Sequence, residues 1–436
     1  MDPFVVGIIG VIALLVFILL RVPIAFALAG IGLVGSIYLM GIERVLSYFP
    51  HLVYSHTSKF TFTAIPLFLL MGYFAFYAGI TDEAYDAARA WVGKIRGGLG
   101  IATVGACALF AASAGSSLAE CAAMAKIAVP EMVKSGYSRR FATGIVASAG
   151  GLAVVIPPSI IMVIYGVATE TSVGQLLIAG IVPGIVYTGV FMLGIYLFAV
   201  IKPSSAPIDP SLDTSWKTRF ASLRKLIDIV IMFSVSIGGI YVGIVTPTEG
   251  AALGAIAAFA VTFFKRKLTW KAFKTAVMET IVASTIIFLL FAGANIFTIF
   301  ITYTGIVEAF AAWLIGLGLT KTALFTAILV MYIILGCFLD SISMMILTLP
   351  FIIPIIEAQG LSLIWFGVIM CMIVEIGCIT PPMGLNVYVM KAAMGESIEL
   401  TEIFAGALPF VILMVLVVYI LYAFPIIALW LPSLMK

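Results

Sequence analysis

Long apolar runs separated by short polar segments make up most of this 436-residue chain. A helix needs about 20 consecutive apolar residues to cross a bilayer. The first run has no positive charge before it, unlike a cleaved signal peptide, so we expect it to remain as a span. We expect about ten spans, over residues 4–20, 23–41, 62–79, 140–168, 176–200, 226–245, 248–264, 277–303, 364–390 and 403–430.

Two further apolar stretches, 99–133 and 322–356, are interrupted by small and polar residues at 113–117 and 340–343. Each interruption predicts a re-entrant hairpin that enters and leaves the membrane on one side. Irregular backbone at that depth is tolerated only where it is buried in protein or lines a wet cavity. Residues 80–97 and 305–320, which precede the hairpins, are expected to be arms near the membrane interface. Both histidines, His51 and His56, are expected to lie in an outer loop beside aromatic residues such as Phe49.

The composition supports this reading, with 63% hydrophobic and only 10% charged residues. Soluble domains carry about 25% charged residues. The net charge of +3 is too small to indicate nucleic-acid binding. The five cysteines lie in apolar stretches without metal-ligand spacing, so we interpret them as small apolar filler.

The distribution of basic residues predicts the orientation. With both termini outside, all but four of the 23 Lys and Arg residues fall on the inner side, and positive charge favours the cytoplasm. The outer ones are Arg44, Lys59, Lys321 and Lys436. The proline-rich segment 201–225 is the one clearly soluble stretch and the expected boundary between two halves.

The two halves resemble one another when the chain is shifted by 224 residues. The shift aligns Pro130 with Pro354, and the pair Pro157-Pro158 with Pro381-Pro382. Since each half holds an odd number of full spans, the second half is inverted relative to the first. The predicted fold class is therefore an all-α polytopic membrane protein with an inverted repeat, each half carrying a hairpin and a Pro-Pro-broken helix. Such repeats are typical of secondary transporters.

The Pro-Pro pairs are expected to free carbonyl oxygens near residues 153–155 and 377–379, because proline cannot donate its N–H. Free carbonyls, with hydroxyls from the facing hairpin tip, suit Na⁺. The first candidate site consists of Ser113, Gly115, Ser116, Ser117, Ala153, Val155 and Pro158, and its counterpart of Gly336, Asp340, Ser341, Gly377, Thr380 and Met383. The alternative is that the small residues serve helix packing and the prolines only kink the helices.

Several polar residues lie within apolar segments. Asp340 is interpreted as a cation ligand or coupling group, or as a structural acceptor for the hairpin backbone. Glu120 and Glu375 could each have a functional role in the site, or be structural carboxylates that are solvated or paired with another group. Glu249 fits a helix-start carboxylate stabilised by the dipole. Asn386 could contact polar groups of a solute or serve packing.

Five motifs occur in order: Gly-Ser-Ser at 115–117, Val-Ile-Pro-Pro-Ser at 155–159, Gly-Ile-Val-Thr-Pro-Thr-Glu at 243–249, Phe-Leu-Asp followed by Leu-Pro-Phe-Ile-Ile-Pro, and Ile-Thr-Pro-Pro-Met-Gly-Leu-Asn at 379–386. Together they resemble the large membrane subunit of tripartite ATP-independent periplasmic (TRAP) transporters, along nearly the whole chain. The sequence departs from that pattern in Leu-Ala-Glu-Cys at 118–121 and in Ala153, where glycine is common.

The resemblance implies an elevator mechanism in the bacterial inner membrane with both termini periplasmic. It implies scaffold parts at 1–98 and 226–321, transport parts at 99–200 and 322–436, and a cytoplasmic linker at 201–225. It also implies import of a small organic anion, a carboxylate or sulfonate, coupled to two or more Na⁺ ions. The expected partners are a periplasmic substrate-binding protein and a separate small four-helix membrane subunit, besides membrane lipid. Residues expected to bind the solute are Ser117, Glu120, Pro158, Ser159, Ser341, Gly384 and Asn386.

Two alternatives remain open at this point. A stand-alone Na⁺- or H⁺-coupled carrier of the same wider superfamily would share the hairpins and the inverted repeat. An intramembrane enzyme would need a nucleophile and base or paired carboxylates, but Ser116 has no expected buried histidine and Asp340 no expected aspartate partner. We therefore expect a transporter and no enzymatic activity.

Overall fold

The computed structural model describes residues 1–382 and 384–435, and within these the chain is helical without a β-strand. Seven helical segments of the described residues are long and apolar enough to cross a membrane. Shorter apolar helices, including α1 (Pro3–Leu19) and α2 (Ile24–Met40), accompany them. The chain is thus a multi-pass membrane protein. The seven segments are Phe60–Tyr77, Val173–Ile201, Trp216–Val242, Pro247–Phe264, Trp270–Thr304, Ser341–Ala358 and Leu400–Ala423.

Helix breaks lie where the small-residue clusters predicted them. The first hairpin consists of α6 (Gly98–Ala114) and α7 (Ser117–Lys134), and the second of α18 (Lys321–Gly336) and α19 (Ser341–Ala358). At the first tip Gly115 has φ +67°, a left-handed conformation that glycine adopts without steric cost. The tip after Gly115 therefore starts a new helix instead of continuing α6.

The two proline pairs also interrupt their helices. The expected span 140–168 consists of α8 (Arg139–Ala149), a 3₁₀ turn and α9 (Ile160–Ala168). The expected span 364–390 consists of α20 (Leu363–Gly377) and α21 (Leu385–Met394). In both places the chain is non-helical at the prolines, as the missing N–H groups require.

Four helix boundaries differ from the expected bounds of the spans and loops. The expected outer loop contains the helix α3 (Ile42–Thr57), which buries Val45 and Phe49, four positions apart on one helical face. A helical segment begins at Trp216, inside the expected linker, because Ser215 caps α12 (Trp216–Leu223). The long α16 (Trp270–Thr304) starts earlier than expected. The last expected span ends at Ala423, and α23 follows Pro425 as a separate helix.

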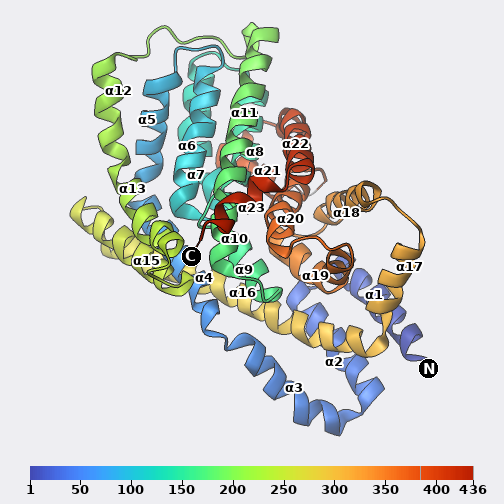
Figure 1. The fold of residues 1–436 in the computed structure, drawn as a ribbon. Coiled ribbons are helices and arrows are strands. Elements are labelled where there is room, and N and C mark those ends of the chain that lie inside the picture. Colours follow the sequence, from blue (N-terminus) through green and yellow to red (C-terminus); the bar gives the residue numbers. More distant parts are fainter. Residues whose placement is uncertain (383, 436) are drawn as a thin grey trace.

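The helices form two neighbouring groups in Figure 1. The long helix α16 packs against α2 and α4, and α15 packs along α4. Next to this group, the arm α5 packs against α6, α11 lies beside α6, and α8 packs against α22. The bounds of the helices not yet given are α4 (Ala64–Tyr77), α5 (Ile80–Val92), α10 (Val173–Ala179), α11 (Ile181–Ile201), α13 (Ile227–Phe233), α14 (Gly239–Val242), α15 (Pro247–Phe264), α17 (Ile306–Gly316), α22 (Leu400–Ala423) and α23 (Ile426–Ser433).

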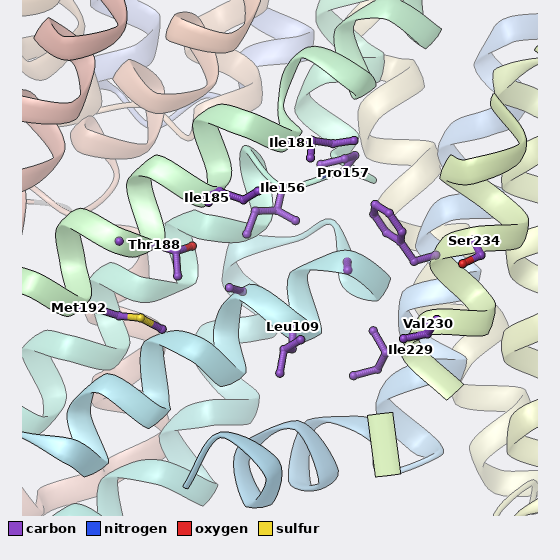
Figure 2. Close-up of a pocket in the computed structure, with 14 residues that line it drawn as sticks. Leu109, Ile156, Pro157, Ile181, Ile185, Thr188, Met192, Ile229, Val230 and Ser234 are labelled. Atoms are coloured by element: carbon purple, nitrogen blue, oxygen red, sulfur yellow. The ribbon is translucent and has the colours of Figure 1, made fainter. Parts of the chain in front are cut away.

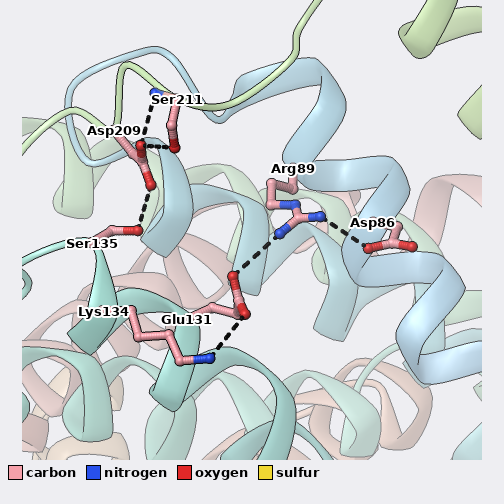
Figure 3. A network of polar contacts seen from close by, with 7 residues as sticks. All are labelled: Asp86, Arg89, Glu131, Lys134, Ser135, Asp209 and Ser211. Atoms are coloured by element: carbon pink, nitrogen blue, oxygen red, sulfur yellow. Dashed lines mark hydrogen bonds and ion pairs between the residues drawn. The ribbon is translucent and has the colours of Figure 1, made fainter.

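An apolar groove opens between α6, α11 and α13 (Figure 2). Elsewhere, Arg89 of α5 forms an ion pair with Glu131 of α7 at 3.3 Å (Figure 3). Near them, Ser135 and Ser211 donate hydrogen bonds to Asp209 of the linker. These bonds, with that from Ser135 first, lower the pKa of the Asp209 carboxyl. The arm, the hairpin and the linker are therefore joined by ionic and polar contacts.

Candidate functional site

Glu375 lies at the centre of the polar cluster between the two halves. Its side chain is fully buried on α20. The amide Nδ2 of Asn386 donates to Glu375 Oε1 at 2.6 Å, and the hydroxyl of Ser341 donates to Oε2 at 3.5 Å. Asn386 belongs to the helix after the second proline pair and Ser341 to the second hairpin. Glu375 therefore connects the second hairpin tip to the second break.

The same cluster reaches the first half of the chain. Asn386 Nδ2 also donates to the carbonyl of Ala147 on α8 at 3.3 Å, and the thiol of Cys121 on α7 donates to the Asn386 carbonyl at 3.4 Å. The hydroxyl of Ser117, at the first hairpin tip, faces Glu375. Residues far apart in sequence thus meet in one buried site.

A second carboxylate, Glu120 on α7, belongs to this cluster. It is fully buried, and neither of its oxygens accepts a hydrogen bond of good geometry from a described residue; the nearest group able to donate is the thiol of Cys107. Glu375 lies within electrostatic range of it. No ion pair between described residues involves either carboxylate. A buried carboxylate without a partner is costly, so either a proton or a positive charge close by would stabilise these carboxyls.

The first hairpin tip lies against the first break. A Cβ atom on Gly115 would lie 2.7 Å from the carbonyl oxygen of Pro158, and the amide of Ile160 donates to the Gly115 carbonyl at 3.4 Å. One carbonyl that the prolines were expected to free is occupied, because the buried hydroxyl of Ser159 donates to Val154 O at 2.6 Å. The same hydroxyl caps α9.

The remaining predicted ligands of the first site lie around this contact. Ser113 is buried and its hydroxyl donates to the Phe110 carbonyl at 2.9 Å, while the Ser116 hydroxyl accepts from the amide of Ala119. Ala153 and Val155 are buried in and directly after the 3₁₀ turn. The structure thus brings the predicted residues of the first site together. Their role as Na⁺ ligands stays a prediction.

The second hairpin tip lies against the second break in the same way. Gly336 and Gly377 are so close that a Cβ on Gly336 would overlap the Cα of Gly377. The thiol of Cys337 donates to the Pro381 carbonyl at 3.2 Å, and the hydroxyl of Thr380 donates to Ile376 O at 2.6 Å. Backbone of α18 can approach α20 this closely only because both residues lack side chains.

Asp340 caps α19 at the second tip. Its Oδ2 accepts from the amides of Ile342 and Ser343, both at 3.1 Å, which is the structural alternative stated above. Oδ1 takes no part in these bonds, so a second role remains a prediction. Gly384 adopts φ +44° at the start of α21. Met383, the last predicted ligand, lies outside the described residues.

The groups at the two tips can be compared with the ligands that cations require. No group of three or more His, Cys, Asp or Glu among the described residues is arranged to bind a metal ion. A hard monovalent cation is bound mainly by carbonyl, hydroxyl and carboxylate oxygens, and these are the groups that line both tips. The two carboxyl oxygens of Glu120 and Oδ1 of Asn386 accept no hydrogen bond of good geometry from a described residue.

A cavity of about 220 Å³ between α4, α7 and α16 reaches the first tip at Ser116. Lys126 on α7 and Glu279 on α16 also line it, with the aromatic rings of Tyr73 and Tyr77. The cavity brings one positive side chain to the same opening as the first tip.

Sequence reasoning left Glu375 out of both predicted residue sets, although it links more of them than any other residue described above. The signal was present, because a carboxylate in an apolar span is rare and functional by default. Cys121 and Cys378, interpreted as filler, are donors or neighbours in the same cluster, since the Cys378 thiol lies 3.0 Å from the Ser341 hydroxyl.

Comparison with known proteins decides the family. The sequence profile described as "Tripartite ATP-independent periplasmic transporter, DctM component" matches residues 11–427. The chain belongs to this family, the large permease proteins of TRAP transporters. It is 37% identical over 406 residues to the C4-dicarboxylate TRAP transporter large permease protein DctM of Pseudomonas aeruginosa, covering 91% of this chain and 94% of the relative.

Other members of the TRAP family are similar over comparable lengths. The ectoine TRAP transporter large permease protein TeaC of Halomonas elongata is 30% identical, covering 96% of each chain. Two solved transporter structures share the fold with a TM-score of 0.60 each: YdaH of Alcanivorax borkumensis, 15% identical over 90% of this chain and 89% of that one, and MtrF of Neisseria gonorrhoeae, 12% identical over 91% and 85%.

Proposed function

We propose that this TRAP permease imports a small organic anion by secondary active transport coupled to Na⁺. The observation that carries the proposal is the buried cluster of Glu120 and Glu375, which has no basic partner among the described residues and lies between both hairpin tips. Cations bound at the tips would supply the missing positive charge. They would also offset the charge of an anionic solute there.

An elevator motion of an inverted repeat is part of the proposal. The same order of elements, a hairpin followed by a Pro-Pro-broken helix, occurs in α6–α9 and in α18–α21. In that arrangement the hairpins and broken helices carry the solute, while α2, α4, α15 and α16 form the scaffold. Most predicted solute-binding residues are inaccessible: Glu120, Ser159 and Asn386 are fully buried, and Ser117 and Ser341 are 8% exposed. Solute binding would therefore require the tips to open.

The names of the relatives indicate only a broad class of solute. The relatives named above are described as permeases for C4-dicarboxylates and for ectoine, and a further relative, 32% identical, is an isethionate permease of Oleidesulfovibrio alaskensis; this chain spans 63% of it. We propose a small carboxylate or sulfonate as the solute. The relatives' names as permeases favour transport over the alternative of an intramembrane enzyme.

We further propose a complex with a small membrane subunit and a periplasmic binding protein, as the tripartite family implies. The test is uptake into proteoliposomes with an imposed Na⁺ gradient. We expect little uptake by this chain alone, and uptake after the small subunit and a solute-loaded binding protein are added. Strong unaided uptake would contradict the proposal and favour a stand-alone carrier. Uptake that is indifferent to Na⁺ would refute the coupling.

A further inference from the structure

The groove in Figure 2 is lined mainly by apolar side chains, with Thr188 and Ser234 as its polar residues. It has a volume of about 510 Å³ and lies over α6, with α11 on one side and α13 on the other. Its walls include Leu109, Ile156, Ile185, Met192 and Phe233. Ile185 is 66% exposed, so the groove is open to the surroundings of the helices. Within a membrane those surroundings are lipid acyl chains.

The groove continues along the arm helix. A second apolar groove of about 530 Å³ shares Ala108, Leu109, Thr188 and Met192 with the first and extends to α5 and to the helix leading into α13. Its far end is lined by Trp91, Leu223 and Leu226. The two grooves therefore form one elongated channel, from the proline break at Pro157 to the end of α5.

Aromatic and basic side chains gather at that far end. The guanidinium of Arg219 lies 4.9 Å from the ring centre of Trp216 and 5.9 Å from that of Trp91. Trp216 and Phe220 are 64% and 60% exposed. Exposed aromatic rings and basic residues at the end of apolar helices are typical of the lipid headgroup region. The Nε of Arg219 donates to the carbonyl of Ala90 at 3.4 Å, and Arg219 forms no ion pair with a described residue.

We propose that this channel binds one phospholipid with an anionic headgroup. An acyl chain lies in the channel over α6, and the phosphate lies at Arg219, whose guanidinium faces Trp91 at the far end of the channel. The inference goes beyond the proposed transport function and does not depend on it.

The channel has free space at one position where a larger side chain can be introduced as a test. Gly189 on α11 lines the channel, and a Cβ built on it meets no atom within 4 Å. Gly189→Leu therefore fills channel space without displacing protein. Gly30 on α2 is equally open but lies outside the channel, so Gly30→Leu is the matched control. Arg219→Gln removes the positive charge of the protein that faces the lipid headgroup. Arg266→Gln, which removes a positive charge outside the channel, is its control.

The experiment uses the full-length chain in phosphatidylcholine vesicles that contain a phosphatidylglycerol with a photoreactive diazirine in its acyl chain. Labelled peptides are identified by mass spectrometry, and the same measurement is made with a diazirine phosphatidylcholine. We expect phosphatidylglycerol to label α6, α11 and α13 at the channel, and Gly189→Leu to abolish that labelling while Gly30→Leu preserves it. Arg219→Gln should weaken it roughly fivefold, as the loss of one basic residue near a lipid phosphate implies.

Four results would overturn the inference. One is labelling spread evenly over lipid-facing helices such as α2 and α15. Another is channel labelling that is unchanged by Gly189→Leu in protein that remains folded. The third is equal labelling by phosphatidylcholine and phosphatidylglycerol, together with no effect of Arg219→Gln. That result would show that the channel has no preference for an anionic headgroup. If added small subunit blocks the labelling, the channel is a protein interface instead.

Discussion

The charge of Glu375 provides the sharpest test of the proposed site. Glu375→Gln keeps the size of the side chain and removes its charge. A cation bound at Ser341, whose hydroxyl lies 3.5 Å from Glu375 Oε2, would be at roughly 6 Å from the carboxylate, where two unit charges interact with about 3 kcal/mol at an effective dielectric constant near 20. Since about 1.4 kcal/mol corresponds to a factor of ten, the variant should need roughly a hundredfold more Na⁺ for half-maximal uptake.

The assay is the Na⁺ dependence of solute uptake in proteoliposomes that contain the complete complex. Glu357→Gln is the control, because Glu357 is an exposed carboxylate near the end of α19. It should leave the half-saturating Na⁺ concentration unchanged. Thermal unfolding in detergent shows whether Glu375→Gln remains folded. A folded Glu375→Gln protein with the native Na⁺ dependence would refute the reasoning that buried carboxylates stabilise the bound cations.

Three further predictions concern other parts of the molecule. Asp340→Asn should abolish Na⁺-dependent uptake yet preserve thermal stability, because asparagine also caps helices; undiminished uptake would contradict a role for its free oxygen. Gly336→Ala should lower the free energy of unfolding by about 1–3 kcal/mol through overpacking, measured by thermal unfolding; native stability would show that α18 can move. Burial opposes the charged form of Lys265, but its bonds to Asp228 and Glu83 outweigh this effect and raise the pKa of Lys265. The native protein should therefore lose stability as the pH rises above about 10.4, where an unfolded chain's lysine loses its proton. Lys265→Met should not show that loss, and an identical alkaline profile for both proteins would contradict the ion pairs.

The local features of the chain were predictable from the sequence because their causes are local. Apolar run length predicted most spans. Proline pairs predicted the breaks in α8–α9 and α20–α21, since a missing N–H disrupts a helix wherever it occurs. The cluster at 113–117 predicted the first hairpin tip. The amphipathic helix α3 was missed because its apolar positions are spaced for one buried face and contain too few consecutive apolar residues to resemble a span.

The composition of the buried cluster depends on contacts between distant residues. The sequence showed that Glu120, Glu375 and Asn386 lie in apolar segments, and it left their roles open. Only the tertiary structure joins Asn386 to Ala147, which is 239 residues away, and to Cys121, which is 265 residues away. Hydrophobic periodicity carries no information about which buried polar groups meet. That is decided by the packing of α7 and α8 against α20 and α21, which determines which donors reach Glu375 and leaves Glu120 without one.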